Sequence, residues 1–110
     1  MNLRSERSTV FTPNGELVLD KPILEAVLLD EKVVVIHDYM AYPQDRPAKN
    51  LVAYTQDGRQ VWVADNPTDL PTDAYVNFIS EVPLVVGNFA GFNCTISSST
   101  GVLENHAFTK

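Results

Sequence analysis

Short runs of β-branched and aromatic residues recur along this chain, and each run ends near Gly, Pro, Asn or Asp. Residues of the first kind suit the pleated surface of a strand, and those of the second kind form tight turns. No stretch sustains the 3.6-residue apolar spacing of an amphipathic helix. The pattern predicts an all-β fold, an antiparallel sheet of consecutive hairpins arranged as a sandwich or a partly open barrel.

We expect nine or ten strands, within the ranges Ser8–Pro13, Glu16–Asp20, Ile23–Leu29, Val33–Tyr39, Asn50–Thr55, Arg59–Ala64, Tyr75–Ser80, Leu84–Asn88, Phe92–Ser97 and Val102–Phe108. Turns are expected at Asn14-Gly15 and Asp57-Gly58, since glycine tolerates the positive φ angles of tight hairpins. The run Val33–Ile36 has no polar alternation, which predicts a strand buried on both faces. The predicted core comprises Val34, Ile36, Leu51, Ala53, Val61, Val63, Ile79, Val85 and Ile96.

The 110 residues, of which 45% are hydrophobic, predict a single domain over residues 1–110 with one sizeable core. The single cysteine, Cys94, excludes an intrachain disulfide and is expected to be a small buried residue. The polar first residues lead into no long apolar stretch, so we expect no secretory signal and a cytoplasmic protein. Neither apolar run reaches the roughly 20 residues that cross a bilayer, so no membrane is expected as a partner.

Charge is unevenly distributed. The formal net charge is −6, and residues 60–109 contain acidic residues but no Lys or Arg. Binding to a phosphate backbone requires clusters of Lys and Arg, so the composition argues against nucleic acid as a partner. The half without bases is either a solubilising surface or an acidic face suited to a basic protein.

Two proline-containing loops, Ala41–Lys49 and Asp65–Ala74, are the longest predicted connections. Binding residues are often carried by loops of this kind on a rigid sheet. The first loop and its start offer two tyrosines and an arginine, a composition typical of interface hot spots, and the second offers three carboxylates. The predicted partner-binding residues are Tyr39, Tyr42, Asp45, Arg46, Asp65, Asp69 and Asp73.

The run His37-Asp38-Tyr39 is the alternative site, because an imidazole beside a carboxylate can act as a general base in a hydrolase. Adjacent strand residues point to opposite faces, however, so His37 and Asp38 are not expected to face one another. The acids of the second loop recur every four residues, which does not match a calcium-binding loop, and turn formation is the more favoured role. The sequence predicts no metal and no cofactor.

Gly15, Gly58 and Gly101 are separated by 43 residues each time, close to the length of a propeller blade. The alternative is a one-off sheet whose hairpins look alike. Residues 50–62, with Asp57-Gly58 and Trp62, and residues 92–103, ending near Thr100-Gly101, resemble units of pyrroloquinoline-quinone-type β-propeller blades. The whole chain resembles small free-standing bacterial all-β proteins of unknown function. The resemblance implies a fold and little about activity.

These observations favour a non-enzymatic protein-interaction module, and the sharpest version is a bacterial immunity protein that binds a basic toxin. The alternatives are a β domain that binds a small ligand or carbohydrate, with Trp62 and the tyrosines as a stacking surface, and a hydrolase that uses His37 and Asp38. A homodimer is also expected, because Leu84–Val86 and Ile23–Leu24 would make edge strands with almost no protecting charge.

Overall fold

The computed structural model of the chain describes residues 1–108. The described residues form no α-helix; a single 3-10 turn, η1 (Tyr39–Ala41), interrupts the strands. The strands are β1 (Asn2–Leu3), β2 (Ser5–Glu6), β3 (Thr9–Thr12), β4 (Gly15–Val18), β5 (Ile23–Leu29), β6 (Lys32–His37), β7 (Leu51–Tyr54), β8 (Gln60–Val63), β9 (Tyr75–Ser80), β10 (Val85–Asn88), β11 (Phe92–Ile96) and β12 (Leu103–Phe108).

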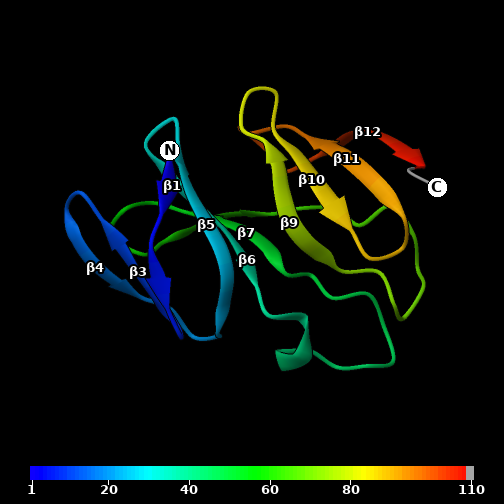
Figure 1. Ribbon diagram of the computed structural model, residues 1–110, viewed down its shortest axis with the longest axis horizontal. Helices are drawn as coiled ribbons and strands as arrows, with labels where there is room; N and C mark the ends of the chain where they lie inside the picture. The colour runs from blue at the N-terminus through cyan, green and yellow to red at the C-terminus, as the bar shows by residue number, and fades with distance from the viewer. Residues whose placement is uncertain (109–110) are drawn as a thin grey trace.

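The strands form three antiparallel sheets and no closed barrel. A five-stranded sheet has the order β1-β5-β6-β7-β8, a four-stranded sheet the order β12-β11-β10-β9, and a three-stranded sheet the order β2-β3-β4. Figure 1 shows the three-stranded sheet at the left, the five-stranded sheet in the middle and the four-stranded sheet at the right. The all-β prediction is confirmed, but the hairpins are divided among stacked sheets and are not arranged as blades around an axis.

Strand β6 lies at the centre of both apolar cores, as its unbroken apolar run predicts. Val34 and Ile36 pack in the core shared with the four-stranded sheet, and Val33 and Val35 pack in the core shared with the three-stranded sheet. All four side chains are fully buried. A strand covered on both faces needs no polar alternation, which is why this run contains none.

All ten predicted strands are present, and the prediction missed two. Strands β1 and β2 have two residues each and are largely polar, so no apolar pattern identifies them. They form because β5 and β3 offer unpaired edges: Asn2 pairs with Val27, and Ser5 pairs with Val10. Pairing with a distant strand, and not local propensity, decides these two elements.

The expected core is partly wrong. Val34, Ile36, Leu51, Ala53 and Ile96 are buried as predicted, and Cys94 is buried too. Val63 and Val85 are only partly buried. Val61 and Ile79 are 43% and 49% exposed, because β8 turns Trp62 inward and β9 turns Phe78 inward, which leaves their neighbours on the outside. The sequence shows that alternate side chains of a strand face opposite sides. Which of the two sets faces a core depends on the neighbouring sheet.

The homodimer stays a prediction, but one of its two premises, that Leu84–Val86 forms an edge strand, is wrong. Val85 and Val86 belong to β10, which lies between β9 and β11 inside the four-stranded sheet. Ile23 and Leu24 belong to β5, and β1 pairs with this strand only at Ala26 and Val27. The apolar residues of β10 therefore need no protecting charge, since their backbone groups are already paired.

Candidate interaction site

The first predicted loop begins with a capped turn. The Asp38 carboxylate accepts a hydrogen bond from the backbone N–H of Met40 at 2.9 Å, which caps the 3-10 turn η1. Short polar side chains commonly satisfy the free donors at the start of such a turn. The cap fixes the direction in which Tyr39 leaves the end of β6. Asp38 is thus engaged with the backbone of its own loop.

The second predicted loop is held in place by a buried carboxylate. Asp73 is fully buried and accepts four hydrogen bonds, from Asn66 Nδ2 and Asn88 Nδ2 at 2.8 Å each, from Thr68 N at 2.9 Å and from Thr68 Oγ1 at 2.6 Å. Hydrogen bonds to an ionised carboxylate are among the stronger ones in proteins. They fold the loop back on itself and attach it to the end of β10 through Asn88.

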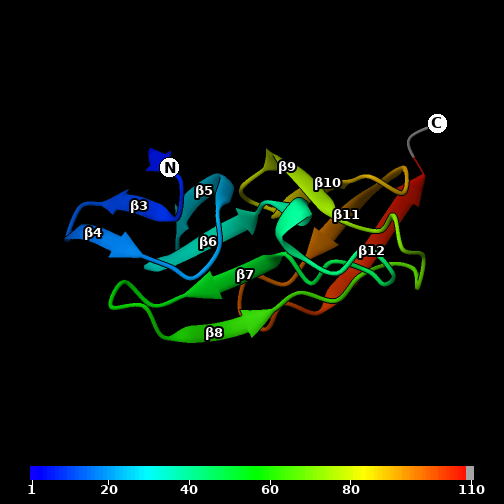
Figure 2. The same cartoon turned by 90° about the horizontal axis from the view of Figure 1, so that it is seen from below.

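The two loops are also bonded to each other. The backbone N–H of Ala48 donates to the carbonyl of Asp73 at 2.9 Å, and Asn66 Nδ2 donates to the carbonyl of Ala48 at 3.0 Å. In Figures 1 and 2 the two connections run next to each other at the same end of the molecule. The sequence predicted both loops as binding segments but gave no sign that they would meet.

Where the loops meet, they enclose a cleft of about 240 Å³. Its lining residues are Tyr39, Pro43, Gln44, Arg46, Ala48, Pro71, Thr72, Ala74 and Phe89. The Tyr39 and Phe89 rings meet edge to face, with centroids 5.4 Å apart. Aromatic rings and prolines form stiff apolar walls, because they have few rotatable bonds. We call this feature the loop cleft.

Large apolar side chains remain exposed beside the loop cleft. Phe89 in its wall is 58% exposed, and Met40 and Leu70, the chain neighbours of the lining residues Tyr39 and Pro71, are 66% and 54% exposed. On the rim, Arg46 Nε lies 3.0 Å from the Asp45 carboxylate, and both side chains are largely exposed. The site thus combines an apolar recess with a polar, charge-balanced rim.

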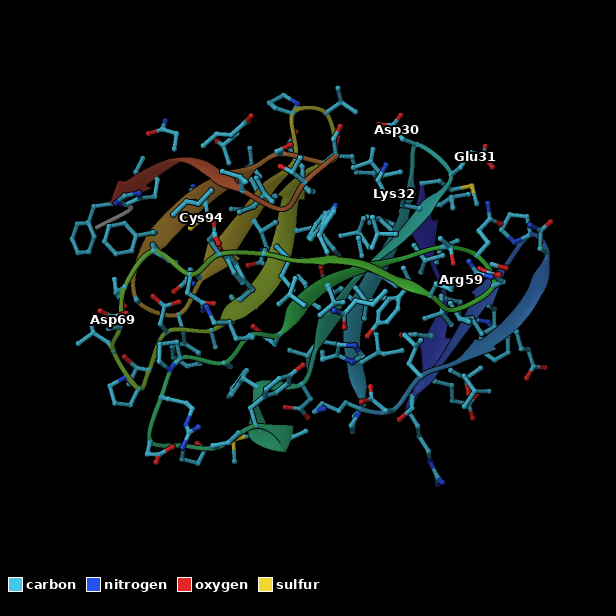
Figure 3. The ribbon with its side chains drawn as sticks, turned by 180° about the vertical axis from the view of Figure 1, so that it is seen from behind. Asp30, Glu31, Lys32, Arg59, Asp69 and Cys94 are labelled. Atoms are coloured by element: carbon cyan, nitrogen blue, oxygen red, sulfur yellow. The ribbon has the colours of Figure 1, made fainter. Side chains whose placement is uncertain are left out.

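The structure places only some of the seven predicted binding residues at the loop cleft. Tyr39 and Arg46 line the loop cleft, and Asp45 pairs with Arg46 at its rim. Asp69 lies exposed on the second loop, at the outer edge of the molecule (Figure 3). The Asp65 carboxylate accepts a hydrogen bond from the backbone of Leu103. Asp73 was expected to be an exposed charge, and this is wrong. Its carboxylate is buried and accepts hydrogen bonds from the loop and from Asn88.

Tyr42 points away from the loop cleft. Its ring lies 5.2 Å from the Lys21 ammonium, and that ammonium is 3.3 Å from the Asp20 carboxylate. Burial raises the pKa of Tyr42 to about 12, and the nearby Asp20 carboxylate contributes in the same direction. Tyr42 therefore packs against the connection between β4 and β5, and the cleft takes its second aromatic ring from Phe89.

Phe89 is the aromatic lining residue that the sequence analysis did not predict. A local signal was present: Phe89 lies in the turn Asn88–Gly91 between β10 and β11, and turn residues seldom reach a core. Its backbone N–H donates to the carbonyl of Ala74, which holds the turn against the second loop.

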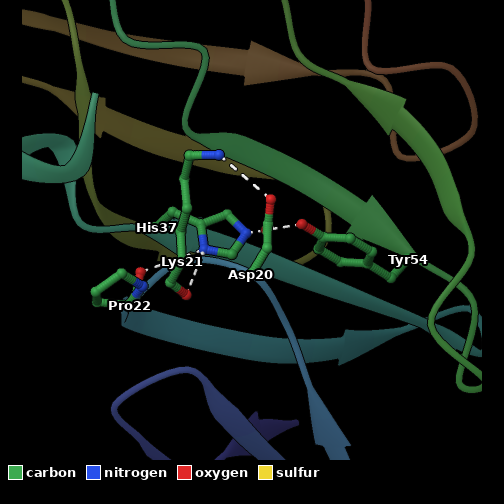
Figure 4. Close-up of polar contacts among 5 residues, drawn as sticks. All are labelled: Asp20, Lys21, Pro22, His37 and Tyr54. Atoms are coloured by element: carbon green, nitrogen blue, oxygen red, sulfur yellow. Dashed lines mark hydrogen bonds and ion pairs between the residues drawn. The ribbon is translucent and has the colours of Figure 1, made fainter. Parts of the chain in front are cut away.

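His37, the centre of the alternative hydrolase site, is a buried structural residue in this fold. Nδ1 is 3.2 Å from the carbonyls of Lys21 and Pro22, so it carries the proton, and Nε2 accepts from the Tyr54 hydroxyl at 2.8 Å (Figure 4). Burial lowers the pKa of His37. Both ring nitrogens are occupied, and Asp38 caps η1, so the two side chains do not act on a common point.

Three further observations concern the described residues outside the loop cleft. Among residues 1–108, no three His, Cys, Asp or Glu side chains gather closely enough to bind a metal ion. The same residues contain no helix long and apolar enough to cross a membrane. Burial raises the pKa of the Cys94 thiol to about 11, so this thiol stays protonated between the sheets.

The comparisons with known proteins show a family and no activity. No curated protein and no solved structure matches this chain. The resemblance to propeller blades is not supported, since the three sheets stack as layers and the matching family is a different one. That family's model covers residues 2–108, and the chain therefore belongs to the family described as a domain of unknown function, DUF7957.

Proposed function

We propose that this chain is a non-enzymatic protein-interaction module that binds its partner at the loop cleft. The observation that carries the proposal is the meeting of two separate loops around an apolar recess flanked by exposed Phe89, Met40 and Leu70. Exposed apolar side chains beside a polar rim are typical of protein–protein contact sites. A partner would insert one apolar side chain between the Tyr39 and Phe89 rings and the prolines.

The size of the loop cleft favours a side-chain anchor over a free small ligand. The cleft measures about 240 Å³, whereas pockets for drug-sized ligands usually measure about 300–1,000 Å³. Trp62, the ring that a carbohydrate-binding reading would use for stacking, is buried under Gly101 and donates its indole N–H to the Ser98 carbonyl. A single aromatic or branched aliphatic side chain matches the available space.

The charge of the chain suggests a basic partner. The net charge is −6, and Asp65 and Asp69 stay exposed on the second loop. Long-range attraction between an acidic and a basic protein speeds their encounter and depends on ionic strength. In its most specific form, the proposal is that the chain is a bacterial immunity protein that binds a basic toxin in the cytoplasm. The loop cleft would then provide the affinity, and the exposed acids would raise the association rate.

Site-specific photo-crosslinking tests the location of the contact. A benzophenone amino acid at position 89 should crosslink one partner in a lysate of the source organism. The same group at position 18 should not, since Val18 is 71% exposed but lies on the three-stranded sheet. Tyr39→Ala should weaken the crosslink at position 89 through faster dissociation. Equal crosslinking at both positions, or no effect of Tyr39→Ala, would place the contact elsewhere.

The identity of the crosslinked protein tests the sharper version. An immunity protein predicts a partner with a net positive charge whose toxic activity is lost when the complex forms. Its association rate should fall steeply as salt is added. A neutral or acidic partner would still support the proposal of a protein-interaction module, but it would exclude an immunity protein that binds a basic toxin.

A further inference from the structure

A second cleft lies where the N-terminal strand leaves the five-stranded sheet. Leu3 of β1 pairs with Ala26 of β5, but the chain then turns away, and Ser5 of β2 pairs with Val10 in the three-stranded sheet. The cleft beside β5 measures about 350 Å³, and we call it the strand cleft. Besides Leu3, Ser5 and Ala26, it is lined by Asn2, Leu24, Glu25 and Phe78. Its lining residues are all different from those of the loop cleft.

A β-bulge lies in β5 at the strand cleft. In the pairing of β5 with β6, Ile23 lies opposite His37 and Glu25 lies opposite Ile36, so Leu24 is the extra residue. Bulges bend a strand locally and change the direction of its side chains, and they are frequent next to functional sites. The bulge thus coincides with the two residues of β5, Leu24 and Glu25, that lie beyond the last pair with β1.

The Glu25 carboxylate is held in place by the neighbouring sheet. Its Oε1 atom accepts a hydrogen bond from the backbone N–H of Phe78 at 2.9 Å. Phe78 belongs to β9, an edge strand of the four-stranded sheet, so the carboxylate takes the place of a strand partner at this donor. A carboxylate has about four acceptor positions, and this bond occupies one of them. The contact therefore fixes the position of a negative charge in the strand cleft and leaves most of its acceptor capacity.

The charge of Glu25 is balanced differently from that of other acids in the chain. Among those that pair with a cation of the chain itself are Asp20, Asp45, Asp57 and Glu81. Glu25 instead bonds a neutral N–H, and among the described residues that line the strand cleft it alone is charged. The cations of the adjoining segment are engaged elsewhere: the Met1 ammonium pairs with Glu81, and the Arg4 guanidinium lies over the Phe11 ring. The strand cleft is therefore complementary to a cation.

We propose that the strand cleft binds a guanidinium group through Glu25. A guanidinium matches a carboxylate with two parallel N–H donors and also stacks on aromatic rings, whereas an ammonium is a compact, strongly hydrated point charge. Phe78 supplies an aromatic ring in the lining, and Leu24, which is 40% exposed, supplies apolar surface for the methylene groups beside the guanidinium. The fold itself makes the same kind of contact between Arg4 and Phe11, 4.0 Å from the ring centre.

The test is an NMR titration of the ¹⁵N-labelled chain with Ac-Gly-Arg-Gly-NH₂, which presents an arginine side chain without terminal charges. The amide signals of Phe78 and Ser5 should shift and saturate at millimolar concentration. The same peptide with citrulline, the uncharged isostere of arginine, should bind at least about tenfold more weakly, because it loses the charge. The lysine peptide should also bind more weakly than the arginine peptide.

Propylguanidinium distinguishes the two sources of the group. Tighter binding of the peptide would assign the strand cleft to an arginine of a protein partner, and tighter binding of propylguanidinium would assign it to a small molecule. Both results support the guanidinium site. The proposal does not rest on the loop cleft, so the crosslink at position 89 and this titration succeed or fail separately.

Glu25→Gln separates the charge from the fold. The glutamine keeps an Oε1 acceptor for the Phe78 N–H but has no negative charge, so binding of the arginine peptide should weaken about tenfold. Glu16→Gln is the matched control, since it changes the net charge equally but lies on β4, outside the strand cleft, and should leave binding unchanged. Equal melting temperatures of the two variants would establish that the fold is intact.

Three results would each overturn the proposal. The first is no saturable shift of the Phe78 and Ser5 amides with the arginine peptide. The second is binding of the citrulline or lysine peptide as tight as that of the arginine peptide. The third is a folded Glu25→Gln variant that binds like the parent. The comparison of peptides uses the unaltered chain, so it decides the matter even where Glu25→Gln does not fold.

Discussion

At the scale of single residues, His37 shows how this fold uses a polar group inside its core. Carbonyl oxygens can only accept, so the contacts with Lys21 and Pro22 fix the proton on Nδ1 and leave Nε2 to accept from Tyr54. The side chain is 1% exposed, yet both nitrogens are satisfied, which removes the usual cost of burying a polar ring. These contacts give the buried histidine at the end of an apolar strand a structural role.

The lowered pKa of His37 predicts a loss of stability in mild acid. Above the unfolded pKa of about 6.5 both states are neutral at this residue, so the native state is not penalised. As the pH falls below 6.5, the unfolded chain takes up the proton first, and the free energy of unfolding drops by at most about 1.4 kcal/mol per pH unit until the folded pKa is reached. Urea denaturation between pH 7 and 5 measures this slope.

His37→Gln should reduce that slope, although it also lowers stability at every pH. His106→Gln is the control, since His106 is exposed on β12 beside the Phe92 ring. It should leave the slope in this window nearly as it is in the parent. A parent slope that His37→Gln does not change would show that another group causes the acid sensitivity.

Asp73 and Asp69 form a matched pair four residues apart. Asp73→Ala leaves several buried donors unpaired, and we expect it to lower the free energy of unfolding by about 3 kcal/mol. Asp69→Ala removes an exposed charge and should change it by less than about 0.5 kcal/mol. Urea denaturation of both variants separates a loop anchor from a surface charge. Equal effects would contradict the structural role assigned to Asp73.

At the scale of elements, the contrast between β6 and β9 decides which apolar residues stabilise the fold. Ile36 of β6 is fully buried between two sheets, whereas Ile79 of β9 is 49% exposed on the outer face of the four-stranded sheet. We expect Ile36→Ala to cost about 3–4 kcal/mol, from lost burial plus the cavity that remains. Ile79→Ala should cost less than about 1 kcal/mol. Denaturant midpoints of the two variants provide the comparison, and similar shifts would contradict the assigned inner face of β9.

The hairpins were the most predictable elements, because their turns depend on local chemistry. Gly58 has φ +95° in the predicted Asp57-Gly58 turn, and Gly15 has φ +120° directly after Asn14. Asp30 and Glu31 both have positive φ in the two-residue turn between β5 and β6, a conformation that is common for Asp but uncommon for Glu. The antiparallel pairing of β5 with β6, which brings Leu29 opposite Lys32, imposes that turn.

At the scale of the whole molecule, the loop cleft proposed for contact and the exposed acids Asp65 and Asp69 lie at the same end. If the partner is basic, Asp65→Lys with Asp69→Lys should slow association by about tenfold at low salt and flatten its salt dependence, with little effect on dissociation. Asp73 is left out of this test because reversing a buried charge would damage the fold. Stopped-flow association at several ionic strengths measures the effect.

The control for that experiment is a reversal at the far end of the molecule. Glu16→Lys on β4 changes the net charge in the same direction but lies on the outer face of the three-stranded sheet. Its effect on the association rate should be clearly smaller than that of a single reversal at Asp69. Equal effects would mean that only net charge matters and that the second loop has no special place in the encounter.

The sequence by itself determined the fold class, the ten longer strands, the burial of β6 on both faces and the two loops, because each rests on local propensity or on period-two patterning. The tertiary structure alone decided the rest. Whether Phe78 or Ile79 faces the core, and whether Asp73 or Asp69 is exposed, depends on which sheet or loop lies opposite. Phe89 joins Tyr39 at the loop cleft only because segments 50 residues apart are bonded through Ala74 and Asp73, and such long-range pairing leaves no trace in local sequence.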